Sequence, residues 1–333
     1  MWPLKWARAW KWENFWLYYG IFSLIVVPFG LAFAVLPHLT GVYASLPVRE
    51  LLWPFFMGVL WGFAQLGAGI CVHRLGLGVA GAVLNGTGAA FGTIIPLLSL
   101  HRSALVRMSG TLIIVGVIVM LAGAAFCGWS GYLREIEAKR RGAGAGFGEE
   151  QAAMRQVSYS ANTYIFTLGI AVSSGVLSSL LNIALAYSGH IMAVTRQQGG
   201  KPEWTPFAVW PIALLGGSLA NVGYAVYLLS KNKTWGNFHR RLFPEAVYPV
   251  LAACLWMAGI ALYSSGTTYL GNLGVSIGFA VFMIMLIVFG QVAGLITGEW
   301  RLMKPRTYVS FAAGVGLLVL AVMVIGLSKY FEP

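Results

Sequence analysis

Long apolar stretches recur along the whole chain, separated by short segments that hold most of its charged residues. A helix needs about 20 mostly apolar residues to cross roughly 30 Å of hydrocarbon. The stretches are too long and too uniformly apolar for barrel strands, so we predict an all-α, polytopic membrane helix bundle. Nine stretches qualify, none with Asp, Glu, Lys or Arg inside: 16–37, 51–72, 77–99, 109–128, 163–187, 205–230, 246–266, 272–297 and 307–328.

Composition agrees with a lipid environment. The 333 residues are 58% hydrophobic and 10% charged, with no aspartate, whereas a soluble domain carries about 25% charged residues. The net charge of +12 raises the question of nucleic acid, but a nucleic-acid binder gathers its basic residues on one surface. Here they lie in the connectors, where positive charge sets orientation in the membrane. We therefore expect a lipid bilayer, and no nucleic acid, as partner.

The basic residues are distributed unevenly between the two sets of connectors. Sixteen lie in the N-terminal arm and in the connectors that follow the second, fourth, sixth and eighth stretches, and six lie in the opposite set. This predicts a cytoplasmic N-terminus and a periplasmic or extracellular C-terminus. Residues 1–15 then form a cytoplasmic basic arm, and residues 129–162 a flexible cytoplasmic linker. The first stretch exceeds the 7–15 apolar residues of a signal peptide, so we expect a retained span.

An internal repeat is visible in two segments. WPFFMGVLWGFAQLGAGICVHRLG (53–76) aligns without a gap to YPVLAACLWMAGIALYSSGTTYLG (248–271), which pairs Pro54 with Pro249 and Trp61 with Trp256. We predict a first repeat over 16–128 with four spans and a second over 163–333 with five. Transporters built from paired halves bind their substrate near the midplane, where the halves meet.

Gln65 is the most informative polar residue inside a stretch. It follows Trp61 by four residues, so both project from one helical face. An unpaired amide in hydrocarbon costs several kcal/mol, so Gln65 should face the bundle interior. Gly62, Gly67 and Gly69 would let a neighbouring backbone approach closely. An indole beside an amide suits a sugar, but Gln65 bonding only a neighbouring helix explains the pattern equally well.

Other uncharged polar and aromatic residues inside the stretches fit the same pattern. Each alone is explained by contact between helices, but together they favour a neutral, hydroxyl-bearing ligand, because an ionic one would need a counter-charge. The Gly88-xxx-Gly92 pair predicts a close-packing face, and a homodimer stays open. The candidate substrate-binding residues are Trp61, Gln65, Asn85, Asn182, Asn221, Trp256, Tyr263 and Gln291.

The cysteines give no sign of a metal site or a disulfide. Cys71, Cys127 and Cys254 lie in apolar stretches, with no CxxC pair and no histidine at metal spacing, so we expect buried, inert thiols. No metal or other cofactor is expected. The chain also lacks any pairing of a nucleophile with a base or of two carboxylates, so we do not expect an enzyme.

At two segments the sequence resembles the L-rhamnose–proton symporter family of the drug/metabolite transporter superfamily. These are PLKWARAWKWENFW (3–16), with its W-x-W-E-x-x-W pattern, and LWGFAQLGAGICVHRLGLG (60–78). Asn182, Asn221 and Gly298-Glu299-Trp300 match as well, and the resemblance covers nearly the whole chain. It implies ten helices in two five-helix repeats, alternating access, and proton-driven uptake of L-rhamnose or a similar neutral deoxy-sugar across the bacterial inner membrane.

Two features depart from the family pattern. The family has a helix before the segment that matches 3–16, whereas Met1 nearly abuts that segment, so nine spans stand where ten are expected. Proton coupling needs a titratable group, and the candidates are Glu13, His73 and Glu299, with Glu13 preferred because it matches the family pattern. Two alternatives stay open: a carrier of another small metabolite or drug with this fold, and a non-transporting membrane protein without the first helix.

Overall fold

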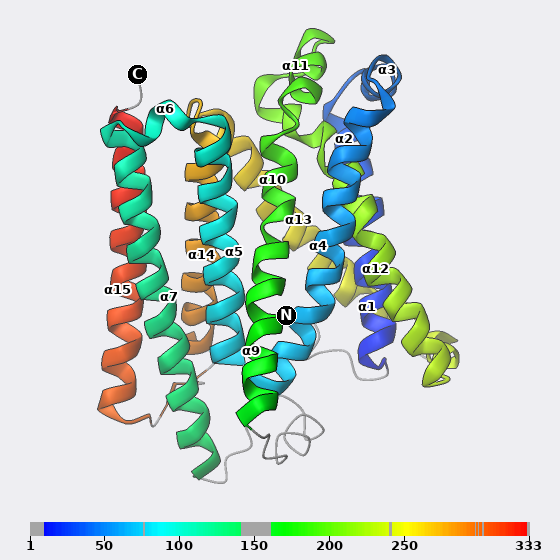
Figure 1. The fold of residues 1–333 in the computed structure, drawn as a ribbon. Helices are drawn as coiled ribbons and strands as arrows, with labels where there is room; N and C mark the ends of the chain where they lie inside the picture. The colour runs from blue at the N-terminus through cyan, green and yellow to red at the C-terminus, as the bar shows by residue number, and fades with distance from the viewer. Residues whose placement is uncertain are drawn as a thin grey trace. The chain divides into compact units, whose positions relative to one another are not determined.

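The computed structural model describes residues 10–75, 77–140, 161–239, 242–296, 298, 300–301 and 303–331. Within these ranges, nine helices are long and apolar enough to cross a membrane, and each overlaps one predicted stretch. The prediction of an all-α, polytopic bundle is therefore confirmed (Figure 1). The spans are Trp12–Val35, Val48–Val72, Val79–Leu100, Met108–Arg134, Ile165–Gln197, Pro202–Lys231, Leu242–Thr268, Gly274–Ile296 and Pro305–Phe331.

The chain forms two compact units, each made of two separate segments. The first unit comprises Met1–Leu66 and Leu180–Tyr269, and the second comprises Gly67–Ser179 and Leu270–Pro333. Each unit thus draws residues from both predicted repeats, whose existence stays a prediction.

The first span contains an irregular turn. α1 (Trp12–Ile21) continues through the π-helical segment η2 (Phe22–Val26) into α2 (Val27–Val35). The irregularity has a local cause: Pro28 lacks an N–H, and in a regular α-helix its ring would clash with the carbonyl of Leu24. Single π-helical turns relieve such strain and are frequent at functional sites. The other elements of the first unit are α3 (Leu39–Ser45), the first part of α4 (Val48–Leu75), α10 (Leu180–Ala186), α11 (Gly189–Gln197), η3 (Pro202–Ala208), α12 (Trp210–Lys231), η4 (Trp235–His239) and α13 (Leu242–Thr268).

α4 and α12 touch through their backbones. A Cβ atom added to Gly58 would lie 1.7 Å from the carbonyl oxygen of Ala213, and one added to Gly62 would lie 2.7 Å from that of Gly217. No side chain larger than hydrogen fits between the helices at Gly58. The close approach predicted at Gly62 is therefore confirmed.

The other two glycines of the Gln65 segment differ from each other. A Cβ atom on Gly67 would lie 2.1 Å from the Ser174 hydroxyl of α9, so Gly67 also permits close packing, here within the second unit. Gly69 has no atom within 4 Å of such a position and is exposed. The prediction of a close approach at Gly69 was wrong, because its side of α4 faces open space.

The second unit packs around the pair α7 and α15, which lie side by side in Figure 1. Buried Ile113 and Met120 of α7 belong to one apolar cluster with Leu318 and Ile325 of α15. α5 packs against α7, α9 and α14. The elements of this unit are the end of α4, α5 (Leu77–Leu100), α6 (Arg102–Leu105), α7 (Met108–Arg140), α9 (Ala161–Ser178), α14 (Gly274–Ile296), α15 (Pro305–Leu327) and η5 (Ser328–Phe331).

The small-residue face predicted on α5 is used inside this unit. A Cβ atom on Gly88 would lie 3.1 Å from the carbonyl oxygen of Gly175 in α9, and one on Gly92 would lie 2.2 Å from the Phe279 ring of α14. The prediction of a close-packing face is confirmed, with α9 and α14 as its neighbours.

A buried carboxylate fixes the start of α15. Glu137 of α7 accepts hydrogen bonds from the backbone N–H of Lys304 at 2.8 Å and from the hydroxyl of Thr307 at 2.6 Å. The first N–H groups of a helix have no partner within it, so an external acceptor stabilises the helix end. In the predicted linker, residues 129–140 continue α7 and residues 161–162 begin α9, while 141–160 lie outside the described residues.

The cysteines follow the sequence-based expectation only in part. Cys71 and Cys127 are buried, but Cys254 is exposed. The expectation of a buried thiol was wrong for Cys254, because it lies on a face of α13 that the described residues leave uncovered.

Candidate substrate cavity

A cavity of about 250 Å³ lies inside the first unit. It contains four of the eight predicted substrate-binding residues, and none of its lining residues is charged. In the described parts of the chain, no group of three or more His, Cys, Asp or Glu side chains could hold a metal ion. The chemistry of this cavity therefore comes from amides, indoles and one phenol. Its lining residues are Trp16, Tyr19, Gly20, Leu24, Trp61, Gln65, Asn221 and Trp256.

Two indoles form one wall of the cavity. The rings of Trp61 and Trp256 stack with centroids 6.3 Å apart and planes inclined at 25°. The buried Trp61 ring lies against Gly217, where an added Cβ atom would come within 2.7 Å of it. The glycine therefore makes room for the indole, and the α4–α12 contact sets the position of the wall.

The polar groups of the cavity retain hydrogen-bonding capacity. Asn221 is only 2% exposed, and its Nδ2 donates to the carbonyl oxygen of Gly217 at 3.0 Å, which leaves its Oδ1 as an acceptor. The half-buried Gln65 amide has no hydrogen-bond partner among the described residues, nor does the buried indole N–H of Trp16. A buried polar group without a partner costs about 1–3 kcal/mol, so a hydroxyl-bearing ligand would relieve a real deficit.

Trp16, Tyr19 and Leu24 line the cavity although sequence reasoning gave them no role. Trp16 and Tyr19 lie three residues apart and therefore share a face of α1, a signal that could have been used. Leu24 lies in the π-helical turn, which apolar periodicity does not reveal.

Asn182 and Tyr263 also belong to the first unit but do not line this cavity. The Tyr263 hydroxyl donates to Asn182 Oδ1, and both side chains are buried. Beside them, Trp210 Nε1 donates to the Ser264 hydroxyl at 2.6 Å. The hydroxyl of Tyr263 and the amide oxygen of Asn182 are thus hydrogen-bonded to each other in the buried part of the first unit. This hydrogen bond joins α10 to α13.

Asn85 and Gln291 lie in the second unit. They line a different cavity of about 230 Å³, together with Arg134 and Trp300. The Arg134 guanidinium lies 4.9 Å from the centre of the Trp300 ring. The predicted residues thus fall into three groups: four in the uncharged cavity, two bonded to each other, and two in the second unit.

Glu13, the preferred coupling candidate, is bound at the turn after α12. It is 5% exposed, and its Oε1 accepts hydrogen bonds from Asn232 Nδ2 at 3.1 Å and from the Thr234 hydroxyl at 2.9 Å. Lys233 between the two donors has a φ of 54°, a left-handed conformation that is uncommon outside glycine. The side chain of His73 and the whole of Glu299 lie outside the described residues.

The family model for the L-rhamnose-proton symport protein (RhaT) matches residues 1–330. The chain belongs to the RhaT family. Proteins named L-rhamnose-proton symporter from Mannheimia succiniciproducens and Pectobacterium carotovorum are each 22% identical to it, and one from Cronobacter sakazakii is 23% identical. Each alignment covers 98% of this chain and 92% of the relative. No solved structure matches.

Membership of the RhaT family confirms the resemblance that was inferred from the segments 3–16 and 60–78. The RhaT relatives are named as symporters, which supports a transporter and not an enzyme. With the nine candidate spans, membership of the RhaT family makes the chain a multi-pass bacterial membrane protein.

Proposed function

We propose that this protein is a secondary active transporter that takes up L-rhamnose or a similar neutral deoxy-sugar with protons, by alternating access, and that the cavity of the first unit binds the sugar. The observation that carries this proposal is the combination of a Trp61–Trp256 stack with the Gln65 and Asn221 amides in a cavity without charged lining. The names of the RhaT relatives support the choice of sugar and coupling ion.

The chemistry of a deoxy-sugar matches this lining. The C–H groups of a sugar ring form an apolar face that packs on an indole, as aromatic surfaces favour. Its hydroxyls both donate and accept, and the amides of Gln65 and Asn221 can do the same. The methyl group of a deoxy-sugar needs no hydrogen bond and suits Leu24. An ionic substrate would lack a counter-charge among the lining residues.

Glu13 is proposed to take up the coupling proton. Its carboxylate accepts two hydrogen bonds from the segment directly after α12, the helix that carries Asn221. Protonation would remove the charge and weaken both bonds, because hydrogen bonds to an ionised group are the stronger ones. The protonation state of Glu13 would thereby act on α12 and through it on the cavity.

Uptake into proteoliposomes tests the proposal. Purified protein is reconstituted, an inward proton gradient is imposed, and accumulation of labelled L-rhamnose is followed with and without a protonophore. We expect accumulation that the protonophore abolishes and that unlabelled L-rhamnose competes away. Equilibrium binding, read from tryptophan fluorescence, is measured in parallel. Absence of both binding and uptake would overturn the proposal, and competition by a non-sugar metabolite alone would assign another substrate.

A further inference from the structure

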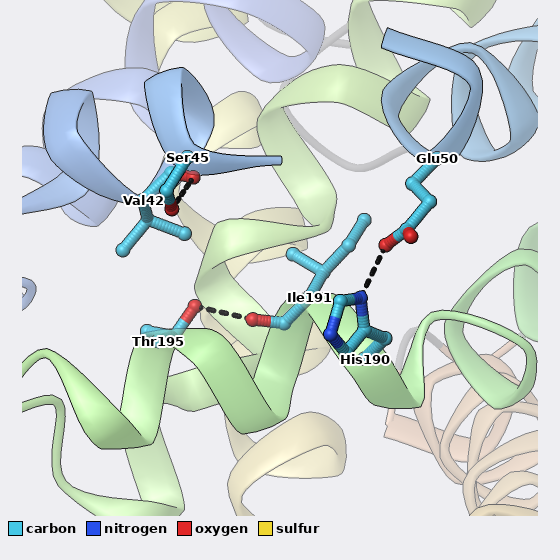
Figure 2. Close-up of polar contacts among 6 residues, drawn as sticks. All are labelled: Val42, Ser45, Glu50, His190, Ile191 and Thr195. Carbon is cyan, nitrogen blue, oxygen red and sulfur yellow. Dashed lines mark hydrogen bonds and ion pairs between the residues drawn. The ribbon is translucent and has the colours of Figure 1, made fainter. Parts of the chain in front are cut away.

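A second cavity of the first unit, of about 650 Å³, opens between the start of α4 and the α10–α11 segment. Figure 2 shows its polar end, where His190 Nδ1 of α11 lies 2.6 Å from Glu50 Oε2 of α4. None of its residues lines the proposed sugar cavity. We call it the α4–α11 groove; its lining residues are Arg49, Glu50, Leu52, Trp53, Phe56, Tyr187, Ser188, His190 and Ile191.

The groove changes from charged to apolar along α4. Arg49 and Glu50 lie in the first turn of the candidate span Val48–Val72, and Phe56 lies about 10 Å further along the helix at 1.5 Å per residue. On this span, Trp53 is 42% exposed and Phe56 is 55% exposed. Large apolar side chains exposed on a membrane helix face lipid, so one side of the groove is open to acyl chains.

Aromatic side chains mark the level between the two ends. The rings of Trp53 and Tyr187 lie 6.0 Å apart at an interplanar angle of 52°. Tryptophan and tyrosine gather at the level of lipid headgroups, where an amphipathic ring has an apolar and a wet side. The charged end of the groove therefore lies at headgroup depth and the apolar end within the hydrocarbon.

The charged end of the groove presents one anionic side chain, Glu50, and one cationic side chain, Arg49. Glu50 Oε2 is held by His190, and Oε1 accepts no hydrogen bond from the residues that the structure describes. The exposed guanidinium of Arg49 likewise has no partner within those residues. A ligand for this end must carry a cationic donor next to an anion.

From this arrangement we propose that the α4–α11 groove binds a phospholipid with an ethanolamine headgroup. The lipid phosphate accepts from Arg49, and the primary ammonium donates to Glu50 Oε1. One acyl chain lies along Leu52, Trp53 and Phe56. A choline headgroup has no N–H to donate, and a headgroup with only negative charge would meet the Glu50 carboxylate. This inference goes beyond the proposed function and does not depend on it.

Native mass spectrometry in equimolar mixtures of phosphatidylethanolamine, phosphatidylcholine and phosphatidylglycerol with identical acyl chains tests the headgroup. The wild-type protein should retain phosphatidylethanolamine over phosphatidylcholine by roughly two- to fivefold, the range of a partly exposed ion pair. Glu50→Gln should abolish that preference, and Arg49→Gln should lower retention of both lipids. Arg196→Gln changes an arginine of α11 that is also exposed and lies outside the groove; it is the matched control and should change nothing.

Quenching of tryptophan fluorescence by lipids with brominated acyl chains independently tests whether the bound lipid lies beside Trp53. Brominated phosphatidylethanolamine should quench the fluorescence of the wild-type protein more strongly than that of the Trp53→Phe variant. Brominated phosphatidylglycerol should quench the two proteins to the same extent. Equal retention of all three lipids by the wild type, a preference for phosphatidylglycerol, or displacement of the lipid by L-rhamnose would overturn the proposal. Because neither measurement reads transport, a failure here leaves the sugar-uptake experiment unaffected.

Discussion

Trp61 and Trp256 stack on each other, with ring centroids 6.3 Å apart, inside the uncharged cavity of the first unit. The gap-free alignment of 53–76 with 248–271 places these two tryptophans at the same position of the predicted repeats. One cavity wall therefore combines residues from α4 and α13 that the predicted repeat would make equivalent.

The stack should contribute to sugar affinity. Replacing Trp256 by alanine removes one indole, and an aromatic contact of about 0.5–1.5 kcal/mol corresponds to a loss of up to roughly tenfold in affinity for L-rhamnose. Trp256→Phe should lose less, because a smaller ring remains. Isothermal titration calorimetry measures both. The control is Leu255→Ala, a neighbour that is 62% exposed and should bind like the wild type. Equal affinity of Trp256→Ala and wild type would contradict this assignment.

Substitution of Gln65 should show which of the two cavities with predicted site residues binds the sugar. Gln65→Leu removes an amide from the uncharged cavity, and the loss of one or two hydrogen bonds to hydroxyls should raise the KM for L-rhamnose about tenfold. The matched change Gln291→Leu lies in the cavity of the second unit and should leave KM unchanged. The reverse result, measured by initial rates of uptake, would move the sugar site to the second unit.

The backbone contact of α4 with α12 predicts a large effect of a single methyl group. Gly58→Ala places a Cβ atom 1.7 Å from the Ala213 carbonyl oxygen, and the enforced shift should lower the free energy of unfolding by about 1–3 kcal/mol. Gly69→Ala on the same helix meets nothing within 4 Å and should be neutral or stabilise by up to about 1 kcal/mol. Thermal unfolding in detergent compares the two. Similar unfolding temperatures would show that the helices are not in backbone contact.

Glu13→Gln should separate transport from proton coupling. The glutamine can still accept hydrogen bonds from Asn232 and Thr234 but cannot exchange a proton. We expect exchange of labelled for unlabelled L-rhamnose to persist while gradient-driven accumulation is lost. Glu203→Gln, whose carboxylate forms no hydrogen bond within the described residues, is the matched control and should accumulate sugar normally. Accumulation by Glu13→Gln at the wild-type level would exclude Glu13 as the coupling group.

Tyr43 should make the free energy of unfolding decrease at high pH. It lies between the first two spans, its hydroxyl donates to the Ala208 carbonyl oxygen at 2.8 Å, and burial raises its pKa above the ordinary value of about 10. A pKa raised in the folded state gives stability that is complete below the unfolded pKa and lost as the pH rises above it. Tyr43→Phe should therefore lose less stability than the wild type between about pH 9 and 11. If the free energies of unfolding of the wild type and of Tyr43→Phe decreased equally across this pH interval, Tyr43 would not be the group responsible.

Sequence reasoning located the spans because their apolar length leaves little choice of structure in lipid. It also named Trp61, Gln65, Asn221 and Trp256 among its eight candidates. Helical periodicity linked Gln65 to Trp61, the internal alignment linked Trp256 to Trp61, and Asn221 was named as a polar residue inside a span. Periodicity shows which residues share a helix face, but it does not show which helix that face meets. The bond between Asn182 and Tyr263, and the separate location of Asn85 and Gln291, could therefore not be predicted.

Contacts between segments that are distant in the sequence could not be predicted from the sequence pattern either. Glu50 and His190 are 140 residues apart, and each occurs at a helix start where charged residues are ordinary. Glu137 fell within the predicted linker, yet it binds the first turn of α15, 170 residues from its Thr307 partner. In both cases the partner is set by how helices pack, which local composition does not encode.

The glycine crossing of α4 and α12 has a consequence for how the cavity meets its ligand. Trp61 lies one turn beyond Gly58, and Asn221 one turn beyond Gly217, so both groups extend from a junction where the backbone of α4 meets that of α12 at Gly58. A backbone contact of this kind leaves little freedom for the helices to shift, and the spacing between indole and amide is preorganised before any ligand arrives. Binding should then require little additional ordering of the protein, which leaves more of the contact energy for discrimination among sugars.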